Sequence, residues 1–409
     1  MIEDLSTELY NFLKNETNIF DMMLQTQHGF YNIIHNVDQL NPYHEEGSVY
    51  VHTMMVVEYL ISEFEGIRIE TLVAAYLHDI GKIYTRTVDK ETNRVRFFGH
   101  HGRSLFEVID ILKRIKSEVF GFQTLNIEMV LYMINFHMVD KYDMPAIKTL
   151  AKMFSNSKDL FDCSPGIFID QLVNLLEADN FGRISRNVVT NMKLKQNKMW
   201  FESLKYDILQ EITDIITEKE VEIYHSDVAI KDKKEKEKPF CLMLIGVPCS
   251  GKSTYVQHYK EGYDSIASEK IEIVSRDNII MSMVDENTTY EEAFDTIDQS
   301  KVNDILDKQI KQLVKNKKDF IIDMTNFSTK ARRRRLSLLT KDYRKEAKVF
   351  IADSKTIFER NENREGKTIK KEVIESMMNG FMLPTFNEFD SIELFVQWLM
   401  IRVFGFLKI

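Results

Sequence analysis

Residues 240–253 read Phe-Cys-Leu-Met-Leu-Ile-Gly-Val-Pro-Cys-Ser-Gly-Lys-Ser. The first six are apolar, which is the length of a short buried strand, and the run ends at Gly246. From Gly246 onward the stretch matches the pattern G-x-x-x-x-G-K-[ST]. The motif requires a strand before it and a helix after it, and the flanking residues predict both. We therefore predict a phosphate-binding loop in an α/β fold with a parallel sheet.

This loop predicts a nucleotide site. Glycine lets backbone N–H groups turn around phosphate oxygens, and the N-terminus of the next helix attracts the same anion. We expect Lys252 to reach the β- and γ-phosphates of ATP and the Ser253 hydroxyl to hold Mg²⁺. A chance glycine turn is the alternative, and the flanking runs argue against it. The loop residues expected to bind ATP and Mg²⁺ are Gly246, Val247, Pro248, Cys249, Ser250, Gly251, Lys252, Ser253 and Thr254.

The two halves of the chain differ in pattern. After the loop, apolar runs at 271–274, 320–322 and 347–352 alternate with helical segments, which is typical of a parallel sheet in an α/β domain. Before the loop, glycine and proline are sparse and apolar residues recur at helical spacing, so we expect an all-α helical bundle. The helices expected there span residues 51–63, 69–78, 103–118, 127–137, 166–180 and 193–220.

A charged segment separates the halves. Residues 231–238 read Lys-Asp-Lys-Lys-Glu-Lys-Glu-Lys and are followed by Pro239. A run without apolar residues has nothing to bury, and proline blocks a continuing helix. We predict domains at 1–225 and 240–409 with a charged linker at 226–239. The alternative is that the run is the exposed end of a helix joining the two halves.

Composition limits the class of protein. The formal net charge of −9 argues against a basic coat, although a local basic groove would still allow nucleic acid as a substrate. The three cysteines have no paired spacing, which favours a reducing compartment. The first residues carry no apolar signal region, and the apolar stretch 394–407 is too short to span a bilayer. We expect a cytoplasmic protein without a membrane segment, in which that stretch is a buried helix or strand.

Polar residues follow the expected strands of the second half. Asp277 comes just after the second strand, at the sheet edge where ligands bind, and a hydroxyl acceptor needs such a carboxylate to take its proton. The alternative for Asp277 is a helix N-cap. Asp323 ends the third strand, in the position of a magnesium-binding carboxylate. The arginines at 332–335 either contact substrate phosphates or form a solvated helix start.

Arg360 and Arg364 lie one helical turn apart and so share a face. Two guanidinium groups on a lid could clamp a phosphoryl group during transfer. The alternative is that these arginines form surface ion pairs, with Glu362 or Glu365 as the partner.

Together these residues resemble the polynucleotide 5′-kinase family over most of 240–386. The resemblance implies that Lys252 and Ser253 bind ATP and Mg²⁺, that Asp277 activates the 5′-hydroxyl and that Arg364 contacts the donor phosphates. It also implies polynucleotide contacts from Arg276, Thr325, Asn326, Arg332 and Arg335. The chain departs from the family at two positions. Ile280 stands where an arginine is usual, and Cys249 stands where glycine is common.

The helical half carries histidines and aspartates on separate segments, which only a bundle could bring together. Imidazole and carboxylate suit transition metals, and a carboxylate such as Asp79 can bridge two of them. For each histidine alone, an ordinary core or surface residue is the alternative. The set is His52, His78, Asp79, His100 or His101, His137 and Asp179.

In the order H…HD…H…H…D this set resembles the HD phosphohydrolase superfamily over about 43–186. The resemblance implies two transition-metal ions such as Mn, Co, Ni, Fe or Zn. Their ligands would be His52, His78, Asp79, His100, His137 and Asp179. It implies phosphate contacts from Lys82 and Arg183. The alternative for Lys82 is a charge at a helix C-terminus, and the alternative for His100 is His101.

The combination resembles HD-domain polynucleotide kinase/phosphatases, the bacterial and phage enzymes that heal nucleic-acid ends. It implies ATP-dependent phosphorylation of 5′-hydroxyl ends and metal-dependent removal of 3′-phosphate or 2′,3′-cyclic phosphate ends on RNA or DNA. A ligase would act downstream. Two alternatives stay open: a nucleoside or other small-molecule kinase fused to a nucleotidase, and a helical half that only regulates the kinase.

Overall fold

The computed structural model describes residues 37–39, 45–118, 123–138, 144–184, 201–218, 238–260, 271–364 and 366–396. The chain divides into two compact units, Met1–Glu218 and Lys219–Ile409. Of the expected linker at 226–239, all but the last two residues lie outside the described part, as do residues 193–200 and 219–220 of the expected helix 193–220. The described part of that helix, 201–218, is helical.

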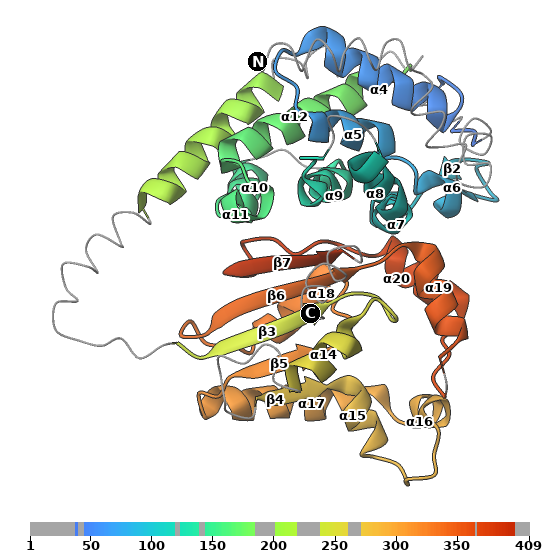
Figure 1. Ribbon diagram of the computed structural model, residues 1–409, viewed down its shortest axis with the longest axis vertical. Coiled ribbons are helices and arrows are strands. Elements are labelled where there is room, and N and C mark those ends of the chain that lie inside the picture. The colour runs from blue at the N-terminus through green and yellow to red at the C-terminus, as the bar shows by residue number, and fades with distance from the viewer. Residues whose placement is uncertain are drawn as a thin grey trace, which may run out of the picture. The chain divides into compact units, whose positions relative to one another are not determined.

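The N-terminal unit is helical, as expected, apart from a two-stranded hairpin (Figure 1). Side chains cap several of its helices: Ser48, Asn126 and Ser164 each accept a hydrogen bond from a backbone N–H in the first turn of the helix that follows. The elements are α4 (Val49–Glu63), α5 (Ile69–Leu77), α6 (Lys82–Thr85), β1 (Thr87–Val88), β2 (Val95–Arg96), α7 (His100–Glu107), α8 (Ile109–Glu118), α9 (Ile127–Phe136), α10 (Met144–Phe154), α11 (Lys158–Phe161) and α12 (Pro165–Phe181).

One expected helix is two. The apolar spacing at 103–118 predicts a single helix, but the structure has α7 and α8 with Val108 between them. Helix α7 also begins three residues earlier, because Gly99 turns the chain with a φ of 78°, a conformation that glycine adopts without a steric penalty. As a result His100 and His101 lie in the first turn of α7.

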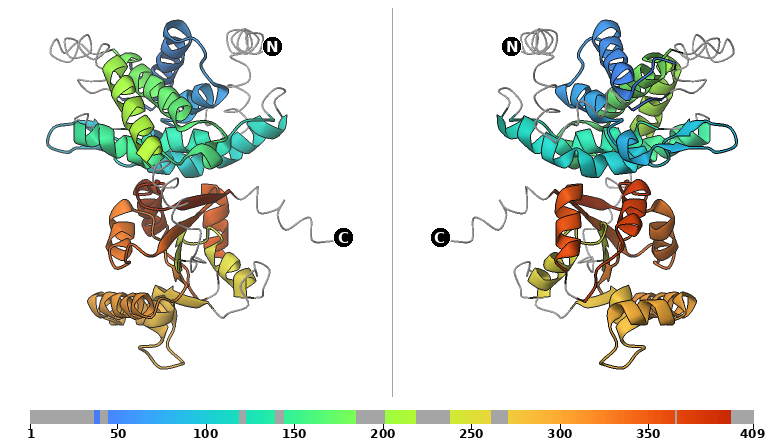
Figure 2. Two further views of the ribbon diagram at one scale, coloured as in Figure 1. Left: turned by 90° about the vertical axis from the view of Figure 1, so that its left-hand side faces the viewer. Right: turned by 90° about the vertical axis from the view of Figure 1, so that its right-hand side faces the viewer.

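The C-terminal unit is the expected α/β domain. The five strands in its described residues are all parallel and lie in the order β4-β5-β3-β6-β7, and helices lie on both faces of the sheet (Figure 2). The elements are β3 (Phe240–Ile245), α14 (Lys252–Lys260), β4 (Glu272–Ser275), α15 (Arg276–Met281), α16 (Tyr290–Thr296), α17 (Gln299–Lys315), β5 (Phe320–Asp323), α18 (Thr329–Leu336), β6 (Arg344–Ile351), α19 (Ser354–Glu362), α20 (Lys371–Asn379) and β7 (Ser391–Val396).

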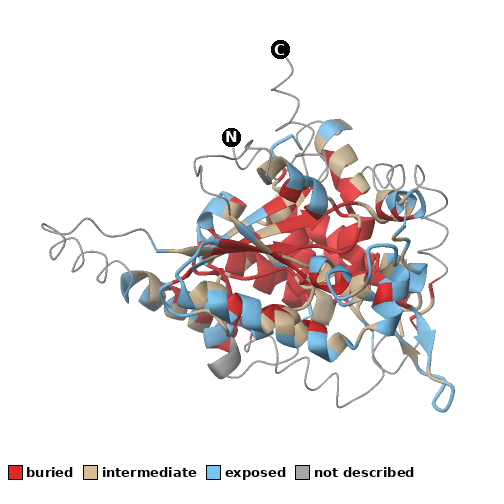
Figure 3. Ribbon diagram, turned by 90° about the horizontal axis from the view of Figure 1, so that it is seen from below, coloured by how far each residue is buried: buried red, intermediate tan, exposed pale blue. Residues whose placement is uncertain are grey.

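The central strands are buried, as Figure 3 shows, because a parallel sheet covered on both faces exposes little of its surface. All four strands that the sequence predicts are present. A fifth, β7, pairs with β6 and contains the described start of the apolar stretch 394–407; the rest of that stretch lies outside the described residues. Parallel strands end at one edge, so the loops after β3, β4 and β5 converge there.

Within the described residues, no helix is both long enough and apolar enough to cross a membrane.

Candidate active sites

The first site is a cluster of four histidines and two aspartates in the N-terminal unit. His52 lies within α4 and Asp179 in the last turn of α12, while His78 and His137 come directly after α5 and α9. His100 begins α7. The four histidines and Asp79 are buried, and a fifth of the Asp179 side chain is exposed. Helix ends therefore bring together the residues that the sequence spreads over more than a hundred positions.

Backbone carbonyls orient the imidazole rings. The Nδ1 atoms of His78, His100 and His137 lie 2.7, 2.8 and 2.6 Å from carbonyl oxygens three residues earlier in the chain. Nδ1 of His52 lies 3.0 Å from the carbonyl oxygen of Gly182. A carbonyl can only accept, so each Nδ1 carries a proton, and Nε2 is the ring atom that remains for a metal.

The Asp79 carboxylate lies between two pairs of histidines. Its Oδ2 is 3.2 Å from Nε2 of His78 and 3.6 Å from Nε2 of His52. Its Oδ1 is 3.3 Å from Nε2 of His100 and 3.8 Å from Nε2 of His137. Two potential metal groups result, His52–His78–Asp79 and Asp79–His100–His137, and they share Asp79. A carboxylate placed in this way could hold two ions at once.

Asp179 completes the first group: its Oδ1 lies 2.9 Å from Nε2 of His52 and 3.6 Å from Nε2 of His78. Within the described residues, Nε2 of His78 and Oδ1 of Asp79 are buried without a hydrogen-bond partner, while Oδ2 of Asp79 forms an ion pair with the Lys82 ammonium. Burial lowers the pKa of His100 to about 4, so its ring is neutral at pH 7. Burial also acts on His78, but the Asp79 and Asp179 carboxylates outweigh it and raise the pKa of His78 to about 10, so its Nε2 would give up a proton on binding a metal. Buried imidazoles and carboxylates in this arrangement fit a pair of transition-metal ions.

The residues expected near the metals have different surroundings. Lys82 begins the four-residue helix α6 and is buried, and its Nζ lies 2.6 Å from Asp79 Oδ2 and 2.6 Å from Gln39 Oε1, so its charge lies against the cluster. His100, rather than His101, supplies its Nε2 to the cluster. Arg183 donates to Asn180 beside the Asp179 turn, and its proposed phosphate contact stays a prediction.

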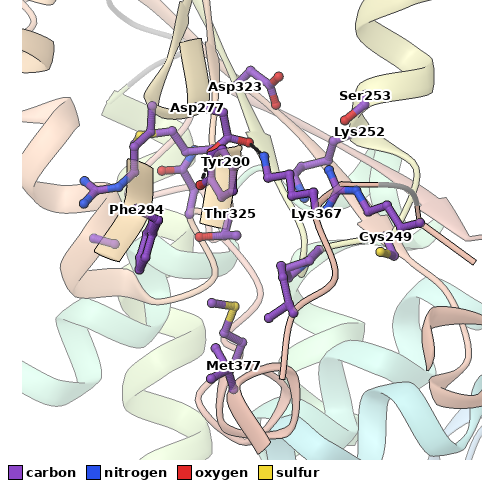
Figure 4. A pocket seen from close by; sticks show the side chains of 18 of the residues that line it. Cys249, Lys252, Ser253, Asp277, Tyr290, Phe294, Asp323, Thr325, Lys367 and Met377 are labelled. Carbon is purple, nitrogen blue, oxygen red and sulfur yellow. Dashed lines mark hydrogen bonds and ion pairs between the residues drawn. The ribbon is translucent and has the colours of Figure 1, made fainter. Parts of the chain in front are cut away.

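The second site is a cavity of about 1210 Å³ in the C-terminal unit. It lies at the carboxyl edge of the sheet and is lined from the phosphate-binding loop, from the residues after β4 and β5, and from residues 360–377 (Figure 4). Residues of the predicted site that line it are Pro248, Cys249, Gly251, Lys252, Ser253, Thr254, Arg276, Asp277, Asp323, Thr325, Asn326, Arg335, Arg360 and Arg364. Gly246, Val247 and Ser250 belong to the same loop but do not line the cavity.

The loop has the backbone shape that its glycines suggest. Gly251 has a φ of 115°. Cys249 has a φ of 63°, a left-handed conformation that explains why glycine is common at this position. Lys252 Nζ donates hydrogen bonds of 2.8 Å to the carbonyl oxygens of Gly246 and Val247. Burial lowers the pKa of Lys252 to about 8, and the Asp323 and Asp277 carboxylates oppose that shift.

Asp277 lies in the first turn of α15, with its side chain about half exposed to the cavity. The hydroxyl of Tyr290 donates a hydrogen bond of 2.8 Å to Asp277 Oδ1, and Lys367 forms an ion pair with Oδ2. Burial and the Asp277 carboxylate raise the pKa of Tyr290, so its hydroxyl stays protonated and donates. No side chain caps α15, so the N-cap alternative for Asp277 is wrong.

The sequence singled out neither Tyr290 nor Lys367, because neither follows a strand or belongs to a motif. Lys367 comes three residues after Arg364, in the segment that carries the expected lid arginines. Within that segment Arg360 donates to the carbonyl oxygen of Cys249 at 3.1 Å, so the segment contacts the phosphate-binding loop directly. The alternative ion pair with Glu365 involves a residue outside the described part.

One expectation on the acceptor side is wrong. Arg332 is fully buried, forms a salt bridge with Glu388 at 2.8 Å and donates to the carbonyl oxygen of Met382 at 2.8 Å, so it does not reach a polynucleotide. Ile280 is also fully buried, although Asp277 is half exposed. An arginine at position 280 would therefore point into the core, and the departure at Ile280 leaves no gap in the cavity.

Other basic residues do line the acceptor side. Arg276 donates to Asn303 at 3.0 Å, and Arg335 donates to Asn303 at 2.7 Å and pairs with Asp307. Lys330 and Arg334, which the sequence did not single out individually, line the same wall. Asn326 is buried, and its Nδ2 donates to the Leu244 carbonyl at 2.8 Å.

Two family models match the chain. Residues 49–155 match the HD domain, and residues 241–384 match an AAA domain. The chain thus joins an N-terminal HD domain to a P-loop domain of kinase-like fold, as the sequence predicted.

Solved structures also resemble parts of the chain. A chain of the Pnkp1/Rnl/Hen1 RNA repair complex is 24% identical with a TM-score of 0.29, covering 36% of this chain and 45% of that one. Chaetomium thermophilum Kti12 with ADP-AlF3 is 12% identical with a TM-score of 0.30, covering 40% and 97%. A gluconokinase from Sinorhizobium meliloti is 12% identical with a TM-score of 0.28, covering 39% and 84%. The chain therefore spans less than half of the RNA repair protein that it matches, and these likenesses carry no argument about its substrate.

Proposed function

We propose that this chain heals nucleic-acid ends with two active sites. The P-loop domain transfers the γ-phosphoryl group of ATP to a polynucleotide 5′-hydroxyl, and the HD domain removes a 3′-phosphate or 2′,3′-cyclic phosphate. A nucleic-acid ligase then joins the ends that both reactions prepare. We propose a cytoplasmic setting, where ATP is abundant and the three cysteines stay reduced.

The observation that carries the kinase half is the position of Asp277 in the same cavity as Lys252 and two arginines. The Asp277 carboxylate takes the proton of the acceptor hydroxyl. The oxygen of that hydroxyl bonds to the γ-phosphorus of ATP as the bond from this phosphorus to ADP breaks, and ADP leaves. Lys252, Arg360 and Arg364 balance the negative charge of the phosphoryl group during transfer. Mg²⁺ bound with ATP would be held by Ser253, with Asp323 nearby.

The phosphatase half is supported by the shared Asp79 carboxylate. His52, His78 and Asp179 would hold one ion, His100 and His137 the other, and Asp79 both. When bound, such ions supply a nucleophile at neutral pH and polarise the phosphoester. The Lys82 ammonium forms an ion pair with Asp79 Oδ2 and would balance negative charge on the substrate phosphate. Arg183 would contact the same phosphate.

The small-molecule alternative differs in its acceptor. A nucleoside or sugar would use only the part of the cavity near Asp277, whereas a polynucleotide would also use the basic wall. Arg276, Lys330, Arg334 and Arg335 favour the polynucleotide, because successive phosphates need successive cations.

The test is an oligonucleotide with a 5′-hydroxyl and a 3′-phosphate, incubated with and without ATP, in RNA and DNA form. We expect 5′-phosphorylation only with ATP and 3′-dephosphorylation in both cases. Lys252→Ala should abolish only the first reaction and Asp79→Ala only the second, with folding checked by circular dichroism. Phosphorylation of a nucleoside but not of the oligonucleotide would support the small-molecule alternative. Loss of both reactions from one folded variant would contradict two independent sites.

A further inference from the structure

Helix α16 carries two aromatic side chains near Asp277, which itself belongs to α15. Tyr290 and Phe294 are four residues apart and so share one face of the helix. Their ring centroids lie 6.0 Å apart with a tilt of 33° between the planes. Both line the cavity, and Figure 4 shows Tyr290 between Asp277 and Phe294.

The two rings have different surroundings. Both the hydroxyl and the ring of Tyr290 already have partners. The hydroxyl donates to Asp277, and the Lys367 ammonium lies 3.8 Å from the ring centroid. Phe294 remains 44% exposed, in the wall of a cavity that the donor and the base also line. Tyr290 therefore fixes the position of an open aromatic face relative to the carboxylate.

Other apolar side chains border the same cavity. Val373 and Met377, on helix α20, line it as well, and Val373 is 41% exposed. Phosphates and sugar hydroxyls need charges or hydrogen bonds, and these apolar groups offer neither. A nucleobase is a flat ring system that can pack against apolar side chains, and every nucleobase stacks well on an aromatic face such as that of Phe294.

We infer that Phe294 is the stacking platform for the nucleobase of the nucleotide whose 5′-hydroxyl is phosphorylated. The inference rests on the proposed kinase function and narrows its acceptor to a nucleotide that still carries its base. Tyr290 holds Asp277 at the hydroxyl while Phe294 holds the base of the same nucleotide. The platform is indifferent to sequence, because stacking reads no hydrogen-bond pattern.

The experiment compares two acceptor oligonucleotides of equal length. One ends in an intact 5′-nucleotide, and the other has a 5′-terminal abasic tetrahydrofuran residue with its hydroxyl retained. For the unaltered full chain we expect kcat/KM to be about 5- to 150-fold higher for the intact acceptor, the range that one base–aromatic stack supplies. Phe294→Ala should lower kcat/KM for the intact acceptor by a similar factor and change that for the abasic acceptor by less than about twofold.

Phe294→Trp is the rescue variant and should keep the preference for the intact end. Tyr206→Ala removes another exposed aromatic side chain, 69% exposed and not among the cavity residues, and should leave the preference unchanged. Equal kcat/KM for the two acceptors in the unaltered chain would overturn the platform and leave the proposed kinase function intact. An equal loss on both acceptors in Phe294→Ala would also overturn it. Absence of transfer to every oligonucleotide would instead reject the proposed function itself.

Discussion

The hydroxyl of Tyr290 donates a hydrogen bond of 2.8 Å to Oδ1 of Asp277. The other oxygen of the carboxylate faces Lys367. Tyr290 thus sets the rotation of the carboxylate, and under the proposed function the acceptor hydroxyl would approach the oxygen that Lys367 also contacts. This relationship makes Tyr290 a positioning residue for the expected base.

We predict that Tyr290→Phe lowers kcat for 5′-phosphorylation by about 10- to 100-fold, since a hydrogen bond to a charged group contributes roughly 1.5–3 kcal/mol. The KM for ATP should stay unchanged, because the ring remains. Asp277→Asn should lower kcat by about 10²- to 10⁴-fold, the usual contribution of a general base. The double variant should be no slower than Asp277→Asn alone. Fully additive losses would mean that Tyr290 does not act through Asp277.

The lowered pKa of Lys252 predicts how ATP binding depends on pH. Burial brings this pKa to about 8, so the ammonium of the free enzyme loses its proton as pH rises through 8. A neutral amine attracts phosphates less, so the Kd for ATP should rise above pH 8 and be nearly constant from pH 6.5 to 7.5. Titration of ATP without acceptor measures this. Lys252→Arg, which keeps its charge at these pH values, should bind ATP without the rise; the same rise in that variant would assign the titration to another group.

The shared Asp79 predicts a metal content. Protein purified without chelators should hold about two transition-metal ions per chain, and Asp79→Asn should hold about one or none. After a chelator has removed the metal, Mn, Co or Ni should restore phosphatase activity far better than Mg²⁺. Mn should also raise the melting temperature of the metal-free protein. His100→Ala and His101→Ala form a matched pair: elemental analysis should find metal loss only in the first. Full phosphatase activity in Mg²⁺ alone, after transition metals are stripped, would contradict the metal assignment.

Local patterns predicted what depends on local structure. The run 240–245 and its glycine predict strand β3 and the loop after it, and parallel strands place Asp277 and Asp323 at the same edge as Lys252. The histidine cluster could be predicted because its order along the chain resembles that of a known superfamily.

Contacts between distant segments could not be predicted in this way. Lys367 reaches Asp277 across 90 positions, and no pattern around Lys367 indicates that partner. The direction of a side chain on a short helix was also beyond the sequence. Asp277 and Ile280 are separated by only about 60° around α15. That angle is enough to leave the Asp277 side chain about half exposed and the Ile280 side chain buried.

The arginines of α18 permit a test that separates stability from substrate binding. Arg332 is buried against Glu388, so Arg332→Ala leaves a buried carboxylate unpaired and should lower the free energy of unfolding by about 3–5 kcal/mol. Its kinetics would then report damage to the fold rather than a lost phosphate contact. Chemical denaturation of the variant measures the loss, and unchanged stability would contradict the role assigned to Arg332.

Arg333 and Arg334 form a matched pair, because both are exposed and only Arg334 lines the cavity. Arg334 is half exposed and pairs with Asp307 at the surface, so Arg334→Ala should change stability by less than about 1 kcal/mol. It should raise the KM for the oligonucleotide about two- to tenfold and leave the KM for ATP unchanged. If Arg334 contacts one phosphate of a single strand, the slope of log affinity against log salt should become shallower by about 0.7. Arg333→Ala should change neither KM nor slope. The same change in both variants would reflect the net charge of the protein, and no change in either would remove the polynucleotide from this wall of the cavity.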